Sequence, residues 1–72
     1  MKAISITLET LDNGNLRATG RHRGTTVAYR DGSDARKLVA YVMKETALGH
    51  RLPDGSYDLT HININDAAAA AI

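Results

Sequence analysis

The chain has no cysteine, tryptophan or phenylalanine, and a single proline among its 72 residues. Without cysteine it can form neither a disulfide nor a thiolate metal site. Small secreted domains usually depend on disulfides, so we expect a cytoplasmic protein. The N-terminal residues enter a strand pattern directly, and no apolar run approaches the roughly 18 residues of a membrane span. We therefore expect neither a signal peptide nor a membrane partner.

Aromatic residues are also scarce, because three tyrosines are the only ones. The core must therefore be made of small aliphatic side chains, whose burial stabilises less per residue. Either such a core is sufficient, or homodimerisation or partner binding supplies further burial. The length predicts one domain over residues 1–72, with a radius of gyration of roughly 11 Å. An enclosed substrate pocket would consume most of this core, which counts against an enzyme.

Residues 3–10 alternate between apolar and polar side chains, which predicts a half-buried strand. A hairpin signal follows at 12–14. A two-residue loop would mix apolar and charged side chains on one face of the sheet. A three-residue loop, with Gly14 in the left-handed conformation, pairs Leu8 with Ala18 and keeps one face apolar. We therefore predict the three-residue loop.

Two further strands are predicted, over residues 15–21 and 25–30. The turn between them lies near 23–24, where glycine follows arginine. If these two residues make the whole turn, the alternation directs Val27 and Tyr29 toward the core, each opposite a small residue of the second strand.

A helix is predicted after the third strand, with Ser33 as its N-cap and Asp34 adding negative charge to its first turn. Gly49 is a natural residue to end it, in the left-handed conformation. Apolar residues recur at helical spacing, with Thr46 continuing the stripe. The stripe consists of Ala35, Leu38, Val39, Val42, Met43 and Thr46.

Residues 57–64 predict a fourth strand whose apolar phase shifts near 60–61, where a bulge would reconcile the two halves. Asn65 or Asp66 can cap a short helix over the alanine run at 67–71. Five alanines cannot hold a helix unless it docks on the rest of the domain.

The element order predicts an α+β fold, a four-stranded antiparallel sheet (β-β-β-α-β) with one main helix packed on one face. The opposite face of the sheet is left open. The predicted core consists of Ile4, Ile6, Leu8, Leu16, Ala18, Val27, Tyr29, Leu38, Val39, Val42 and Leu59.

Catalytic and metal-binding patterns are not recognisable in the sequence. His22, His50 and His61 are far apart along the chain, whereas structural zinc sites normally show clustered ligands. Neither a Gly-x-Ser-x-Gly elbow nor a phosphate-binding glycine loop occurs. We therefore predict a protein that is not an enzyme and that needs no metal or cofactor.

Charge is distributed unevenly. From Arg17 to Lys37 there are six basic and two acidic residues, a net +4, and the rest of the chain carries −3. Three interpretations stay open: a solvated, edge-protecting face, a surface for a protein or nucleoprotein partner, and a nucleic-acid interface, which the overall charge of +1 disfavours. The candidate binding residues are Arg17, Arg21, Arg23, Arg30 and Arg36.

Three strands, a helix cap at 32–34, a helix containing alanine and methionine, and a last strand make a pattern that resembles small proteins of phages and mobile elements. In size and element order it is similar to some anti-CRISPR inhibitors. That resemblance covers most of the chain, without a diagnostic motif. It implies a non-enzymatic, stoichiometric inhibitor that binds the protein surface of a CRISPR surveillance complex, and it carries over no binding residue.

A second resemblance is to the DNA-binding domains of phage integrases and plant transcription factors, which also combine three strands with a helix. It implies a nucleic-acid-binding module that uses the basic strands of the sheet. Two features depart from that pattern. The flanks of the chain are acidic, and no aromatic residue is predicted on the open face.

Overall fold

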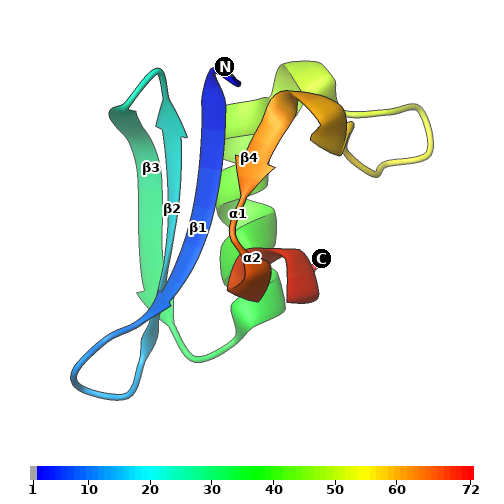
Figure 1. Cartoon of the computed structure of the whole chain (residues 1–72). Helices are drawn as coiled ribbons and strands as arrows, with labels where there is room; N and C mark the ends of the chain where they lie inside the picture. The colour runs from blue at the N-terminus through cyan, green and yellow to red at the C-terminus, as the bar shows by residue number, and fades with distance from the viewer. Residues whose placement is uncertain (1) are drawn as a thin grey trace.

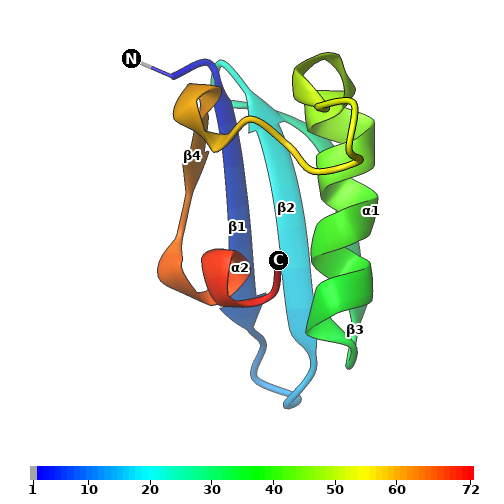
Figure 2. The same ribbon diagram turned by 90° about the vertical axis from the view of Figure 1, so that its right-hand side faces the viewer.

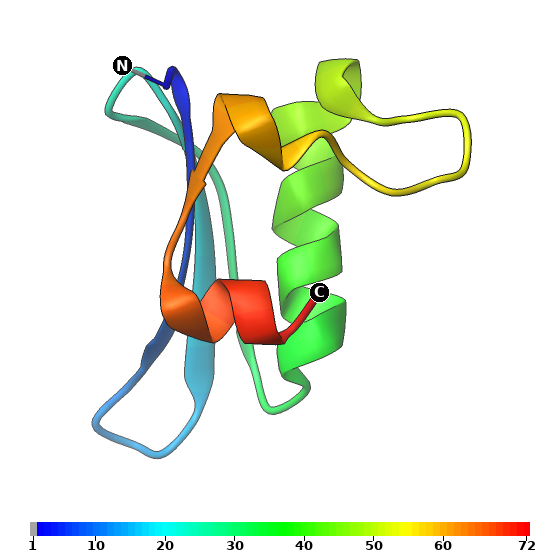
Figure 3. The same ribbon diagram turned by 45° about the vertical axis from the view of Figure 1, so that its right-hand side comes forward.

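Three consecutive strands build most of one sheet, and α1 and α2 lie together on one of its faces (Figure 1, Figure 3). The computed structural model describes residues 2–72. In chain order the elements are β1 Ile4–Thr10, β2 Leu16–His22, β3 Thr25–Gly32, α1 Ala35–Ala47, the 3-10 turns η1 Leu48–His50 and η2 Leu59–His61, β4 Ile62–Ile64 and α2 Asp66–Ala70.

The sheet is mixed, with the strand order β3-β2-β1-β4. β1–β2 and β2–β3 are antiparallel, but β4 runs parallel to β1, so the prediction of a fully antiparallel sheet was wrong. The direction follows from the two hairpins, which leave β3 parallel to β1. α1 then reverses the chain, so β4 runs in the direction of β3 and pairs beside β1 (Figure 2). The α+β class with one main helix on one face is confirmed.

The first hairpin has the predicted three-residue loop. Leu11 N–H donates to the Asn15 carbonyl at 2.7 Å, which closes the loop, and Gly14 has φ +87°. Leu8 lies opposite Ala18, as the alternation requires. Keeping one face apolar was therefore enough to determine this register.

The second hairpin differs from the prediction at β3. Residues 23–24 form the turn, with φ 53° and 82°. A β-bulge then leaves Val27 without a partner, so that Gly20 pairs with Ala28. Val27, the extra residue, is 51% exposed instead of buried. Because the bulge turns every later side chain to the opposite face, Tyr29 is 60% exposed instead of buried.

The buried stripe of α1 is confirmed, but its ends differ from the prediction. The N-cap is Asp34, whose Oδ1 accepts the Lys37 N–H at 3.3 Å, and Ser33 lies one residue outside the helix. Gly49 lies within η1 and continues the helical turn, so it does not end the helix in the left-handed conformation. Leu38, Val39, Val42, Met43 and Ala47 are the buried residues.

The fourth strand is shorter than predicted, because the residues before Ile62 form the 3-10 turn η2. This turn, and not a bulge, produces the shift of apolar phase. Leu59 opens the turn and is 38% exposed, so its assignment to the core was wrong. The predicted N-cap of the short helix was Asn65 or Asp66, and in the structure Asn65 caps α2.

The core lies between the inner face of the sheet and both helices. The alanine tail docks there, since Ala68 is fully buried. α1 approaches β2 most closely at Gly20, where a Cβ atom would lie 2.9 Å from Thr46 Cβ. The radius of gyration is 11.4 Å, close to the expected value. No helix in residues 2–72 is long and apolar enough to cross a membrane. The buried apolar residues are Ile4, Ile6, Leu8, Ala18, Leu38, Val39, Val42, Met43, Ala47, Ile62, Ala68 and Ala71, with Leu16 packed at the edge.

Candidate protein-binding face

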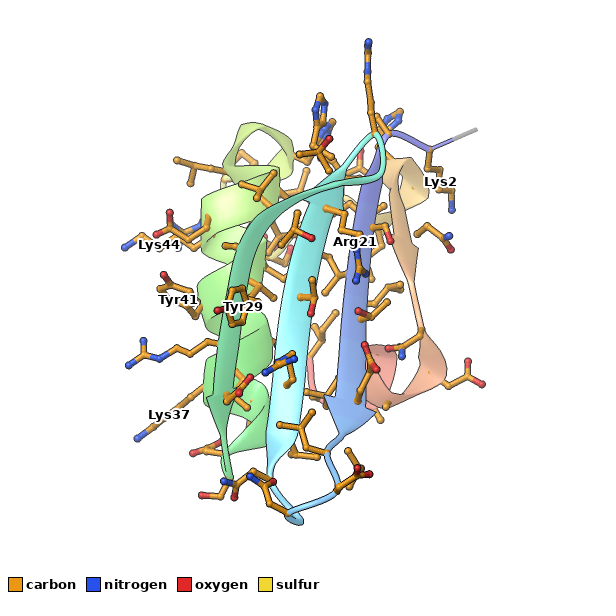
Figure 4. The ribbon with its side chains drawn as sticks, turned by 90° about the vertical axis from the view of Figure 1, so that its left-hand side faces the viewer. Lys2, Arg21, Tyr29, Lys37, Tyr41 and Lys44 are labelled. Atoms are coloured by element: carbon orange, nitrogen blue, oxygen red, sulfur yellow. The ribbon has the colours of Figure 1, made fainter. Side chains whose placement is uncertain are left out.

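The sheet face opposite the helices, here called the open face, is uncovered by any other element of the described chain. Figure 4 views it directly, with Arg21 and Tyr29 in front of the strands. Its strand residues alternate with the buried ones in the observed register. The open face consists of Ser5, Thr7, Glu9, Arg17, Thr19, Arg21, Thr26, Tyr29, Asp31 and Asn63.

Arg17 is held down on this face by two residues of β3. Its Nε and one terminal nitrogen donate to the two carboxylate oxygens of Asp31 at 2.7 and 2.9 Å. Its guanidinium carbon lies 5.3 Å from the centre of the Tyr29 ring, within cation–π distance. The hydrogen bond from Arg17 lowers the pKa of Asp31 below its ordinary value. The charges of Arg17 and Asp31 therefore neutralise each other on the surface that an approaching partner would meet.

The charges of the open face balance. Glu9 lies directly opposite Arg17 on β1, and Asp31 lies opposite it on β3. Arg21 is the remaining cation, and within residues 2–72 it forms no ion pair. Two arginines and two carboxylates give the face a formal net charge of zero, which is not the strong positive field that phosphate backbones require.

A shallow hollow of about 370 Å³ lies between the long side chains of the open face. Thr19 forms its floor and is only 4% exposed, because its neighbours lie over it. Tyr29 stands at one side and Arg21 at the other. Such a hollow can receive one protruding side chain of a partner, and it does not enclose a small substrate.

The predicted arginines do not form one patch. Arg17 and Arg21 lie on the open face, and Arg23 occupies the tip of the β2–β3 turn. Arg30 instead pairs with a buried position of β2 and points to the helix side, where its guanidinium carbon is 5.0 Å from the Tyr41 ring centre. Arg36 lies on α1, beside a separate pocket of about 210 Å³. The bulge accounts for Arg30, because without it this residue would face outward.

Tyr29 and Asp31 are members of this face that the sequence interpretation missed. Asp31 was missed because β3 extends to Gly32 and not only to residue 30 as predicted. A signal for the positions of both residues was present in the charges. Without a bulge Arg17 would lie opposite Arg30, a like-charge pair, whereas one extra residue in β3 brings Arg17 opposite Asp31. Because opposite charges favour direct cross-strand pairing, this criterion would have selected the bulged register.

Two of the three histidines, which are far apart in the sequence and were not expected to cluster, contact each other in the structure. The rings of His50 and His61 are stacked with centroids 5.4 Å apart, and His61 Nε2 lies 3.8 Å from Asp58 Oδ2. Asp58 is engaged by Thr60, whose hydrogen bonds lower the pKa of the carboxyl. Over the described residues, no three potential ligands are arranged to hold a metal ion.

Comparison of the chain with models of protein families, with curated proteins and with solved structures gives no match.

Proposed function

We propose that this chain is a small non-enzymatic binding protein that masks a surface of a protein or nucleoprotein complex, as a phage-encoded inhibitor of the anti-CRISPR type would. The observation that carries the proposal is the open face. Both helices pack on the other side of the sheet, so a surface of three long strands is left for a partner.

The side chains on this face support a protein partner. Tyrosine and arginine are the residue types most enriched among binding hot spots, and Tyr29 and Arg21 flank the hollow. Tyr29 is preorganised by Arg17, which reduces the conformational entropy lost when a partner binds. Threonine hydroxyls around them can adapt their hydrogen bonds to a partner.

Nucleic acid is the second candidate, and two observations favour it. Tyr29 gives the open face an exposed aromatic ring, which the sequence interpretation did not expect there and which can stack on a base. Arg21 and the neighbouring Arg23 form no ion pair in residues 2–72, so both can contact phosphate. Binding by these residues would lose about one unit of log–log salt slope for each contact removed. The neutral open face and the inward position of Arg30 make this the weaker proposal.

The test is affinity capture from a bacterial lysate that contains a CRISPR surveillance complex, with and without nuclease. We expect a multi-subunit complex to be retained after nuclease treatment. Arg21→Glu should abolish retention, and the matched charge reversal Arg36→Glu, beside Tyr57 and the C-terminal Ile72 and away from the open face, should leave it intact. Recovery of bare DNA alone, or equal loss of binding in both variants, would contradict the proposal.

A further inference from the structure

β3 is an edge strand whose outer backbone groups are available to another chain. Arg23 N–H donates to the Ala3 carbonyl at 2.6 Å, so odd-numbered residues of β2 bond to β1 and even-numbered ones to β3. The β3 residues opposite those even-numbered positions, Ala28, Arg30 and Gly32, therefore hydrogen-bond to β2 through their backbone N–H and C=O groups. The intervening Tyr29 and Asp31 direct N–H and C=O away from it.

The usual protections of an edge strand are incomplete here. The bulge at Val27 bends the first part of β3, which limits regular pairing to residues 28–32. Within that stretch there is no proline. The charge of Asp31 is taken up by Arg17, and Arg30 stacks on Tyr41. The side chains of Asp31 and Arg30 therefore do not prevent another strand from pairing with β3.

The helix side of this edge is basic. Lys37, Tyr41 and Lys44 project from α1 past β3 (Figure 4), and their spacing places them on one side of the helix. Arg30 adds a third cation beside Tyr41. Asp34, which lines a hollow with Arg30 and Lys37, and Glu45, one turn after Tyr41, reduce the formal net charge of this side to +1. None of these three cations forms an ion pair within the part of the chain that the structure describes. A strand added to β3 would run directly beneath them.

These charges argue against a second copy of the chain as the added strand. A two-fold β3–β3 pairing would bring the Arg30, Lys37 and Lys44 side of one copy against the same side of the other. Like charges brought together across an interface suppress association. The same cations favour a strand with carboxylates on its helix-facing side.

We propose that the β3 edge binds an extended acidic segment of the partner protein as a fifth strand. Its backbone bonds to Tyr29 and Asp31, and its carboxylates, at alternate positions, face Arg30, Lys37 and Lys44. The intervening side chains pack beside Tyr29 on the open face. This inference rests on the proposed masking function, because it names the chemistry of the partner.

The test uses the whole chain and a synthetic peptide of alternating threonine and glutamate. Lysine replaces glutamate in a control peptide, and a single-stranded thymidine oligonucleotide is the nucleic-acid probe. We expect the acidic peptide to slow amide hydrogen exchange at Tyr29 and Asp31. Lys37→Glu combined with Lys44→Glu should weaken its binding about tenfold or more. The control Arg36→Glu, on another side of the same helix, should change it little.

Equal binding of the lysine peptide, a preference for the oligonucleotide, or unchanged exchange at Tyr29 and Asp31 would overturn the edge proposal. These results differ from failure of the masking function. A captured partner that depends on Arg21 but ignores the Lys37 and Lys44 reversals leaves the masking function standing and removes the edge strand. If the peptide binds at the edge but no partner is captured, the edge strand stands and the masking function is removed.

Discussion

The side-chain amide of Asn65 pairs with the backbone of Leu8 in both directions. Leu8 N–H donates to Asn65 Oδ1 at 3.1 Å, and Asn65 Nδ2 donates to the Leu8 carbonyl at 3.1 Å. The same Oδ1 accepts the Ala68 N–H at 3.0 Å, which caps α2. One side chain thus extends the β1–β4 ladder beyond the end of β4 and starts the helix that fills the core.

Replacing Asn65 should destabilise the domain more than an ordinary cap mutation. Asn65→Ala removes the cap, worth about 1 kcal/mol, and leaves partly buried backbone groups of Leu8 unpaired at about 1–3 kcal/mol. We expect a loss of about 2–4 kcal/mol in the free energy of unfolding, measured by urea denaturation. The exposed Asn63→Ala should stay within about 0.5 kcal/mol. Equal effects of the two variants would contradict this role.

Gly20 is required by the close approach of α1 and not by backbone conformation. Gly20→Ala forces a Cβ against Thr46, so we expect a loss of about 1–3 kcal/mol. Thr46→Ala in the same chain should recover part of this loss, seen as a coupling energy in a double-mutant cycle. Gly49→Ala is the control, since nothing lies within 4 Å of its Cβ position. Additive effects at Gly20 and Thr46 would refute the steric explanation.

Thr46 also carries a stability cost of its own. Its Oγ1 is buried without a hydrogen-bond partner. Thr46→Val replaces the hydroxyl by a methyl group of similar size and removes that unsatisfied group. We expect the free energy of unfolding to rise by about 1 kcal/mol, with a higher Tm. A decrease would indicate that the hydroxyl is satisfied in solution.

Stability should fall in acid, partly through Asp31. Its pKa is lowered in the folded state by the hydrogen bond from Arg17. A lowered pKa gives stability that is present above the unfolded value, about 3.9 for aspartate, and that is lost as the pH falls through the folded value. Asp31→Asn should reduce the drop in Tm below about pH 4. Asp54 and Asp58, whose pKa values are also lowered, should account for a remaining drop. An ordinary carboxyl titration midpoint for Asp31, measured by NMR, would contradict the pairing.

Periodicity alone predicted the parts of the fold in which one residue type alternates cleanly. The β1–β2 register followed from keeping charge off the inner face, and the α1 stripe followed from its apolar spacing. The parallel β4 could not be predicted locally, because strand direction depends on where α1 returns the chain.

The candidate site was harder to predict because it depends on one inserted residue. The bulge at Val27 moves Tyr29 to the open face and Arg30 to the helix side. The apolar pattern favoured the register without a bulge, because Val27 and Tyr29 are large apolar side chains at alternate positions, as is typical of core residues. Small inner residues at Gly20 and Ala18 leave room for α1 instead of for these side chains.

The central claim is that the uncovered side of the sheet binds a partner protein, and hydrogen exchange on the captured complex tests it most directly. We predict slower exchange along β2 and β3, the strands that carry Arg21 and Tyr29, in the complex than in the free chain. The 51–57 loop and α2, on the opposite side, should exchange unchanged. Protection confined to that loop and α2, or a chain that retains no partner protein after nuclease treatment, would contradict the claim.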